Sequence, residues 1–283
     1  MSDAFLAVDW GTTNRRVYRI EDGIVTAGGR DDRGARAVAQ ADYPAEVAAI
    51  RQEFGALPML LAGMVGSTIG WQPVPYIAAP AGLAELSKGL ALIHEGVAII
   101  PGIAQYEPAD VMRGEEVQLL GAAAAGLIPD DALVCQPGTH AKWVRMAGGR
   151  IASFTTAMTG ELLALLRAHS ILAPQLTGPI AADDAFRAGV AESRRGTLAA
   201  SLFGIRARAL LGQGEDGAAF ASGLLIGADA ISYVGAETIH VLGDEGLGGL
   251  YVAAIETLGG VATLVDSHAG FVAGITRIRE LAR

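Results

Sequence analysis

The chain has 283 residues, of which 51% are hydrophobic and 18% are charged, so it is long enough for one large or two ordinary globular domains. A formal net charge of −9 argues against a nucleic-acid partner, because the protein lacks the basic field that releases phosphate counterions. The single cysteine, Cys135, excludes an intramolecular disulfide and fits a reducing cytoplasm.

The first 28 residues predict an antiparallel meander, with strands over 5–9, 16–21 and 23–28. The first turn reads Gly11-Thr12-Thr13-Asn14 and follows a carboxylate, Asp9. Small hydroxylated and amide groups, together with backbone N–H groups, suit an oxyanion such as phosphate. A carboxylate beside phosphate indicates a hydrated Mg²⁺ between the two negative charges. The alternative is an ordinary β-turn built from turn-prone residues.

Helices and buried strands alternate in the next hundred residues. Helical spacing of apolar residues predicts helices over 44–54, 81–93 and 113–127, and apolar runs predict strands over 58–67 and 96–103. Residues 132–157 then repeat the opening pattern of strand, Gly-Thr turn, strand, Gly-Gly turn and strand. A meander followed by alternating strands and helices indicates an α/β fold, here duplicated.

The rest of the chain completes the second copy. Helices are predicted over 160–168, 183–192, 202–211, 218–234 and 250–258, and strands over 238–244 and 262–266. We therefore expect two domains, 1–130 and 131–283, with the final helix, 268–283, free to pack back on the first domain. Thr159 is expected to cap its helix, and Arg15 and Arg16 are expected to face opposite sides of their strand.

Two further glycine-bearing turns call for an explanation. The segment PGTHAKW offers Gly138, Thr139 and His140, with Lys142 just beyond, and the segment GDEGLGG precedes a helix. The N-terminus of a helix favours an anion, and glycines without Cβ atoms admit a flat ring or a ribose. Two hairpins that bind phosphates and a glycine-rich shelf predict a nucleotide cleft between duplicated domains. The Walker A pattern is absent, and no G-x-G-x-x-G fingerprint follows the first strand.

Five segments carry a family resemblance over essentially the whole chain: AVDWGTTNRRVYRI, AGMVGSTIGWQPVPY, DVMRGEEVQLLGA, PGTHAKWV and FTTAMTGELLALLRAHSIL. The order of elements resembles the actin-like ATPase superfamily, with its ribonuclease H-like fold, and the five segments resemble the 2-dehydro-3-deoxygalactonokinase family. The resemblance implies phosphorylation of 2-dehydro-3-deoxy-D-galactonate at O6 with ATP and Mg²⁺, in galactonate and galactose catabolism.

The resemblance also implies site residues at matching positions. These are Asp9, holding Mg²⁺ through water, with Gly11, Thr12 and Thr13 in the first phosphate turn, Gly138 and Thr139 in the second, and Gly243, Gly248 and Gly249 in the adenosine motif. His140 and Lys142 are further candidates for contacts with phosphate. For His140 a structural hydrogen bond is the alternative.

The catalytic base departs from the pattern of many related sugar kinases, which use an aspartate at the second hairpin or at the start of the connecting helix. Here the helix start offers Arg113, Glu115 and Glu116. Either glutamate could be the base that orients a primary hydroxyl and accepts its proton late. The alternative is that each merely stabilises the first turn of the helix by complementing its dipole. The planar, permanent charge of Arg113 suits the substrate carboxylate or the transferring phosphoryl group, and a structural ion pair is the alternative.

The segment after the 58–67 strand suits a polyol. Ser67 and Thr68 supply hydroxyls, and Trp71 and Tyr76 supply an aromatic face and a further hydroxyl on one loop. Packing of the two aromatic residues over the edge of the domain is the alternative.

Rival functions differ in what they require of the chain. A kinase of another small sugar acid or polyol is the nearest alternative, and a non-catalytic protein related to Hsp70 or actin would need insertions that 283 residues barely accommodate. The N-terminus lacks the pattern of a secretory signal and no apolar run reaches about 18 residues, so we expect a cytoplasmic protein without membrane or nucleic-acid partners. A homodimer is compatible with the sequence.

Overall fold

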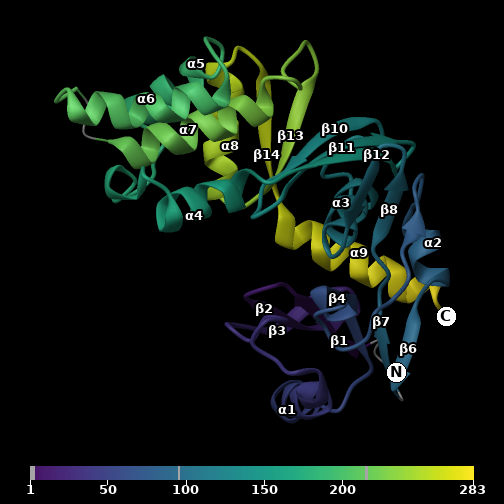
Figure 1. Ribbon diagram of the computed structural model, residues 1–283. Coiled ribbons are helices and arrows are strands. Elements are labelled where there is room, and N and C mark those ends of the chain that lie inside the picture. Colours follow the sequence, from purple (N-terminus) through teal and green to yellow (C-terminus); the bar gives the residue numbers. More distant parts are fainter. Residues whose placement is uncertain (1–3, 95, 214–215) are drawn as a thin grey trace. The chain divides into compact units, whose positions relative to one another are not determined.

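The computed structural model describes residues 4–94, 96–213 and 216–283, which form two compact units (Figure 1). The first unit comprises the chain up to Asp131 together with Met146–Phe154 and Ser267–Arg283. The second comprises Ala132–Arg145 and Thr155–Asp266. Within the described residues, no helix has the length and apolar character that a membrane crossing requires.

The first unit contains a six-stranded sheet of order β3-β2-β1-β4-β7-β6 and a small sheet of order β5-β8-β9. Its elements are β1 (Ala4–Trp10), β2 (Arg15–Glu21), β3 (Ile24–Asp31), α1 (Tyr43–Phe54), β4 (Met59–Gly63), the 3₁₀ helix η2 (Met64–Gly66), β5 (Ile77–Ala78), α2 (Leu83–Lys88), β6 (Ala91–His94), β7 (Val97–Ile99), β8 (Ile103–Tyr106), β9 (Ala109–Met112), α3 (Glu115–Ala124) and α9 (Ser267–Leu281).

The two faces of β1 have different neighbours. Because side chains alternate along a strand, Leu6, Val8 and Trp10 share one face, where they join the apolar core that includes Val47 and Ile50 of α1. Asp9 lies on the other face, within reach of Gln118 of α3. The pairing of β1 with β2 (antiparallel) and with β4 (parallel) confirms the predicted meander and its continuation.

Helices α3 and α9 lie side by side in the first unit (Figure 1). Their backbones approach so closely that a Cβ atom on Gly121 would lie 2.0 Å from the carbonyl oxygen of Gly270. Glycine is therefore required at this crossing. The close packing fixes α3, whose first turn then lies near the end of β1.

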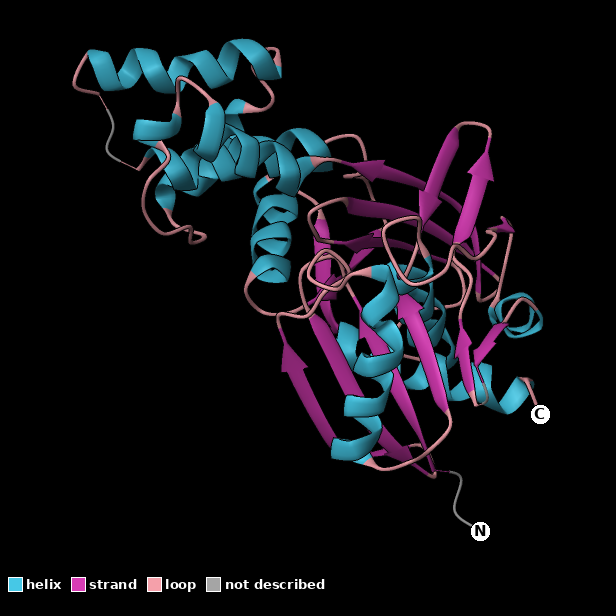
Figure 2. Cartoon of the chain, turned by 60° about the horizontal axis from the view of Figure 1, so that its bottom comes forward, coloured by secondary structure: helices cyan, strands magenta, loops and turns pink. Residues whose placement is uncertain are grey.

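The second unit repeats the arrangement of the first. Its elements are β10 (Ala132–Gln136), β11 (Ala141–Ala147), β12 (Arg150–Ala157), α4 (Thr159–His169), the 3₁₀ helix η3 (Ala173–Gln175), α5 (Asp184–Glu192), α6 (Leu198–Leu210), α7 (Gly217–Ala230), β13 (Thr238–Gly243), α8 (Leu247–Thr257) and β14 (Val261–Asp266). The sheet order β12-β11-β10-β13-β14 matches β3-β2-β1-β4 at the start of the chain, which confirms the predicted duplication. The segment between β12 and β13 is helical (Figure 2).

Two predicted elements of the first unit differ from the structure, and one hairpin was missed. The helix predicted over 81–93 ends at Lys88, because the N–H of Gly89 caps α2, and the following residues form the edge strand β6, paired with β7. Of the strand predicted over 96–103, only Val97–Ile99 form a strand, β7, and Ile103 begins β8 in a different sheet. The β8–β9 hairpin was not predicted, because its strands have only four residues each.

Candidate active site

The first candidate turn, Gly11–Asn14 between β1 and β2, is braced from one side by the segment 34–36. Gly34, Ala35 and Arg36 donate backbone hydrogen bonds of 3.2, 2.9 and 3.1 Å to the carbonyls of Thr13, Gly11 and Thr12. The N–H and C=O of one peptide plane point in opposite directions. The brace therefore directs the N–H groups of the turn to the other side, as an anion site requires.

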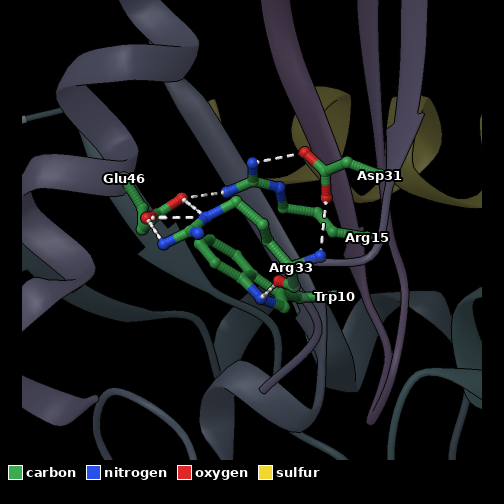
Figure 3. Close-up of polar contacts among 5 residues, drawn as sticks. All are labelled: Trp10, Arg15, Asp31, Arg33 and Glu46. Carbon is green, nitrogen blue, oxygen red and sulfur yellow. Dashed lines mark hydrogen bonds and ion pairs between the residues drawn. The ribbon is translucent and has the colours of Figure 1, made fainter. Parts of the chain in front are cut away.

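A network of charged side chains holds this brace in place (Figure 3). Arg15 is 6% exposed and donates to Glu46 Oε2 over 2.8 Å and to Asp31 Oδ2 over 2.5 Å. Arg33 pairs with Glu46 as well, and its backbone carbonyl accepts a 2.8 Å hydrogen bond from Trp10 Nε1. The hydrogen bond from Arg33 lowers the pKa of Glu46 most. The pairs join β2, β3 and α1 to the segment that supports the turn.

Asp9 lies at the end of β1 on the face covered by α3. Its Oδ2 is 3.7 Å from Arg16 Nη1 and 3.5 Å from Gln118 Nε2, and its side chain is 16% exposed. Burial raises the pKa of Asp9 to about 6, Arg16 partly offsets this rise, and the charge of Glu115 adds to it. With Arg15 bound to Glu46 on the α1 face, the predicted alternation of Arg15 and Arg16 is confirmed. The Asp9 carboxylate is poorly compensated and suits a cation.

The first turn of α3 separates its two glutamates. Gly114 has φ +107°, and a Cβ atom there would lie 3.1 Å from Gly63 Cα, so the helix begins against the end of β4. Both oxygens of Glu116 accept from the N–H of Gly114 at 2.9 and 2.7 Å, and this side chain is 0% exposed. Burial raises the pKa of Glu116 to about 8. Glu115 is only half-buried, accepts a 2.9 Å bond from Arg113 N and lies close enough to Asp9 to shift its pKa.

Arg113 is 9% exposed and has an unusual environment for a buried cation. Its Nη2 donates to the carbonyl of Val74 over 2.7 Å, and its guanidinium lies 4.3 Å from the ring centroid of Tyr76. Among the described residues, its Nε and Nη1 have no hydrogen-bond partner and no carboxylate forms an ion pair with it. The structural ion pair that was the alternative for Arg113 is therefore not found in the described chain.

The predicted polyol loop begins at η2. Trp71 stacks on Tyr43 at a centroid distance of 5.8 Å. One face of the Trp71 ring therefore packs against the domain, which was the alternative to polyol binding. The hydroxyl of Ser67 donates to Met64 O over 2.7 Å, whereas Thr68 and Tyr76 are exposed. Tyr76 and Arg113 thus place an exposed aromatic residue beside a buried cation.

The second candidate turn, residues 137–140, connects β10 to β11 and supports the start of α4. A Cβ atom on Gly160 would lie 2.6 Å from Gly138 O, and the N–H of Glu161 donates to Thr139 O over 3.0 Å. His140 Nε2 and Glu161 Oε2 are 2.5 Å apart, so the structural hydrogen bond that was the alternative for His140 is present. Lys142 is only 4% exposed, within β11, and its contact with a nucleotide stays a prediction.

The third candidate turn leads from β13 into α8. Gly248 packs so closely that a Cβ atom would lie 2.6 Å from Leu264 Cδ1, whereas Gly249 faces open space. A Cβ atom on Gly243 would lie 3.8 Å from Pro137 Cδ. The second and third turns also share a hollow of about 30 Å³, whose lining includes Gly138 and Leu247. The second unit therefore brings these two predicted nucleotide-binding turns together.

The donor set at Asp9 fits one kind of metal ion. No group of three or more His, Cys, Asp or Glu side chains suitable for a metal occurs among the residues that the structure describes. A single carboxylate fits an ion that keeps most of its water, as Mg²⁺ does. Asp9 thus fits the predicted water-mediated contact.

Comparisons with known proteins agree on one family. A model of the 2-keto-3-deoxy-galactonokinase family matches residues 9–278. The chain is 38% identical over 297 residues to a Rhizobium meliloti (strain 1021) protein named probable 2-dehydro-3-deoxygalactonokinase, covering 96% of this chain and 95% of the relative. It is 33% identical over 298 residues to the 2-dehydro-3-deoxygalactonokinase of Escherichia coli (strain K12), covering 98% of each.

Solved structures show the same relationship. A Sinorhizobium meliloti crystal structure whose protein carries the same unproven assignment has a TM-score of 0.91 and 37% identity, covering 98% of this chain and 96% of that one. Component A of the (R)-2-hydroxyglutaryl-CoA dehydratase of Acidaminococcus fermentans has a TM-score of 0.54 at 12% identity, covering 99% of each chain, which is a likeness of fold alone. The predicted duplicated actin-like fold is thereby confirmed.

Proposed function

The chain belongs to the 2-keto-3-deoxy-galactonokinase family, and on this premise we propose that it transfers the terminal phosphoryl group of ATP to O6 of 2-dehydro-3-deoxy-D-galactonate. One observation carries the proposal beyond the family name. The half-buried Glu115 and the buried Asp9 lie close together, and the same helix start holds the buried cation of Arg113, whose Nε and Nη1 have no hydrogen-bond partner among the described residues. This arrangement offers a base, a position for metal and an anchor for an acid.

Phosphoryl transfer depends mainly on positioning and on neutralisation of charge. The N–H groups of Gly11–Asn14 receive the phosphates, and Asp9 would hold Mg²⁺ through its water shell. When bound, that ion neutralises charge on the phosphate chain. Glu115 orients the O6 hydroxyl and accepts its proton late in the reaction. Glu116 fixes the backbone at the helix start, since both of its oxygens are occupied by Gly114.

The substrate carboxylate supplies the charge that Arg113 lacks. Among the described residues no carboxylate forms an ion pair with this buried cation, and a guanidinium with two nitrogens free of hydrogen bonds suits a planar anion. Tyr76, whose ring lies against the guanidinium, and the hydroxyls of Ser67 and Thr68 then bind the polyol part. In the second unit, Gly138 and Thr139 bind ATP phosphates, and Gly243, Gly248 and Gly249 bind the adenosine.

The purified protein is expected to consume ATP with 2-dehydro-3-deoxy-D-galactonate, and to do so only with a divalent cation. A coupled ADP-release assay with Mg²⁺ measures this rate, and NMR of the product identifies the phosphorylated oxygen. The C4 epimer, 2-dehydro-3-deoxy-D-gluconate, and D-galactonate serve as matched acids. A rate no faster with the galactonate derivative than without any acid refutes the proposal, and faster turnover of another acid favours a different sugar-acid kinase.

Substituting Arg113 with methionine is expected to raise the KM for the sugar acid about 10- to 100-fold, because a hydrogen bond to a charged group contributes about 1.5–3 kcal/mol. The KM for ATP should change little. Arg113→Lys should recover part of the loss, since it keeps the charge without the planar fork.

An uncharged analogue separates this role from a general structural one. A substrate with a hydroxymethyl group in place of the carboxylate should be much poorer for the wild type and equally poor for Arg113→Met. If the variant still prefers the acid by the wild-type ratio, Arg113 does not bind the carboxylate. Arg150→Met, which removes an exposed ion pair with Glu85, is the control.

A further inference from the structure

Asp229 lies near the end of α7, where the helix dipole disfavours an anion. Its carboxylate nevertheless accepts three hydrogen bonds, from Trp143 Nε1 at 2.8 Å, Thr159 Oγ1 at 2.8 Å and Tyr251 Oη at 3.1 Å. Within the described residues, no cation forms an ion pair with it. Burial raises the pKa of Asp229, and each of the three donors opposes that rise. The helix dipole and burial thus both disfavour a charged carboxylate at position 229, which suggests that Asp229 has a role other than stabilising the fold.

The three donors come from three different elements. Trp143 belongs to β11, Thr159 is the first residue of α4, and Tyr251 lies in the second turn of α8. The sequence predicted Thr159 as a helix cap, and this prediction is wrong, because α4 has Met158 at its N-cap position and no side-chain capping bond. The hydroxyl of Thr159 instead donates to Asp229.

Each donor is connected to one of the turns of the second unit. Thr159 precedes Gly160, whose backbone meets the carbonyl of Gly138, and Trp143 follows the same turn along β11. Tyr251 lies one helical turn after Leu247, at the start of α8. Thr159, Tyr251, Gly138 and Leu247 all line the hollow of about 30 Å³ between the two turns. Asp229 thus connects the supports of both turns through a single side chain.

We propose that Asp229 is a positioning residue for the nucleotide, whose carboxylate holds the second phosphate turn and the β13–α8 turn in the arrangement that binds ATP. The inference rests on the proposed function only for the identity of the nucleotide. A carboxylate can accept all three hydrogen bonds on its two oxygens. An amide has a single acceptor oxygen, and its NH₂ group would face groups that themselves donate. Asparagine at this position leaves at least one donor without its partner.

Asp229→Asn is expected to raise the Kd for a non-hydrolysable ATP analogue about tenfold or more, because at least one buried hydrogen bond to a charged group is lost. Calorimetry without sugar acid measures this Kd, so the result does not depend on which acid is phosphorylated. The KM for the sugar acid should stay within about twofold of the wild type, since the three donors of Asp229 all belong to the second unit. Glu237→Gln, which breaks an exposed ion pair with Arg145 of β11, is the matched control and should leave the Kd unchanged.

Single-donor variants keep the test decisive if Asp229→Asn fails to fold. Thr159→Val and Tyr251→Phe each remove one donor and should each weaken binding of the analogue about threefold or more, whereas Thr159→Ser keeps the hydroxyl and should not. A lower melting temperature with an unchanged Kd would make the cluster merely structural and overturn the proposal. An equal rise in Kd for Thr159→Ser would overturn it as well. Normal analogue binding by a wild type without kinase activity would refute the proposed function alone.

Discussion

Asp9→Asn is expected to lower kcat about 100-fold or more while the KM for the sugar acid changes little. The substitution keeps the size and the turn propensity of the side chain and removes only its charge. An interaction that strengthens as charge shifts along the phosphate chain acts on the transition state, so its loss lowers kcat. Loss of one such electrostatic contact typically costs about 2.7–4 kcal/mol of transition-state stabilisation. Steady-state kinetics at saturating Mg²⁺ and ATP measure the effect.

The same variant should be more stable than the wild type near neutral pH in the absence of ligands. The pKa of Asp9 is about 6 in the folded chain against 3.8 in a model peptide, so folding favours the protonated form. The wild type therefore loses stability as the pH rises from about 4 through about 6, by an amount on the order of 3 kcal/mol. Asp9→Asn has no such loss, so its advantage in melting temperature should be present at pH 8 and absent near pH 4.

Asp42→Asn is the control for both measurements. Asp42 is exposed, makes no side-chain capping bond and lies outside the candidate site. It should leave turnover and the pH profile of stability unchanged. Near wild-type turnover in Asp9→Asn, or a stability profile parallel to that of the wild type, would reduce the Gly11–Asn14 segment to an ordinary turn.

Local patterns account for what the sequence predicted correctly. Strand alternation and turn residues depend on neighbours a few positions apart, so both meanders and the opposite directions of Arg15 and Arg16 could be read without a structure. The same patterns failed over 81–93, where the apolar residues after Gly89 continue a helical spacing but pair with β7 as an edge strand. Periodicity over four residues does not separate these two outcomes.

Long-range contacts account for what the sequence did not show. Glu46 carries no motif, yet it joins Arg15 and Arg33 across 31 and 13 positions and thereby supports the first turn. Asp229 reads as a single charge in an apolar helix, and its donors lie 86, 70 and 22 positions away. A buried charge within an apolar helix was the one available signal for this cluster, and it names no partner.

The two adjacent glutamates of α3 could not be distinguished in the sequence, and the structure gives them opposite roles. Glu115 is half-buried beside Asp9, whereas Glu116 is fully buried with both oxygens bound to the N–H of Gly114. Adjacent helical residues project about 100° apart, so only one of them can face a ligand on a given side. Burial and exposure, and not residue type, make this distinction.

Glu115→Gln is therefore expected to lower kcat about 100-fold or more, and Glu116→Gln is expected to retain near wild-type turnover. A general base contributes about 10²–10⁴ to a rate, and the lower end applies here because phosphoryl transfer needs the proton only late. Glutamine matches the neutral form of Glu116, which prevails at neutral pH because its pKa is about 8 in the folded chain. Glu116 should cost the wild type stability as the pH rises from about 4.5 through about 8, and Glu116→Gln should keep only the loss that Asp9 contributes up to about pH 6. Rates measured beside melting temperatures from pH 4 to pH 9 test both variants, and equal losses of kcat in the two would remove Glu115 from its role as the base.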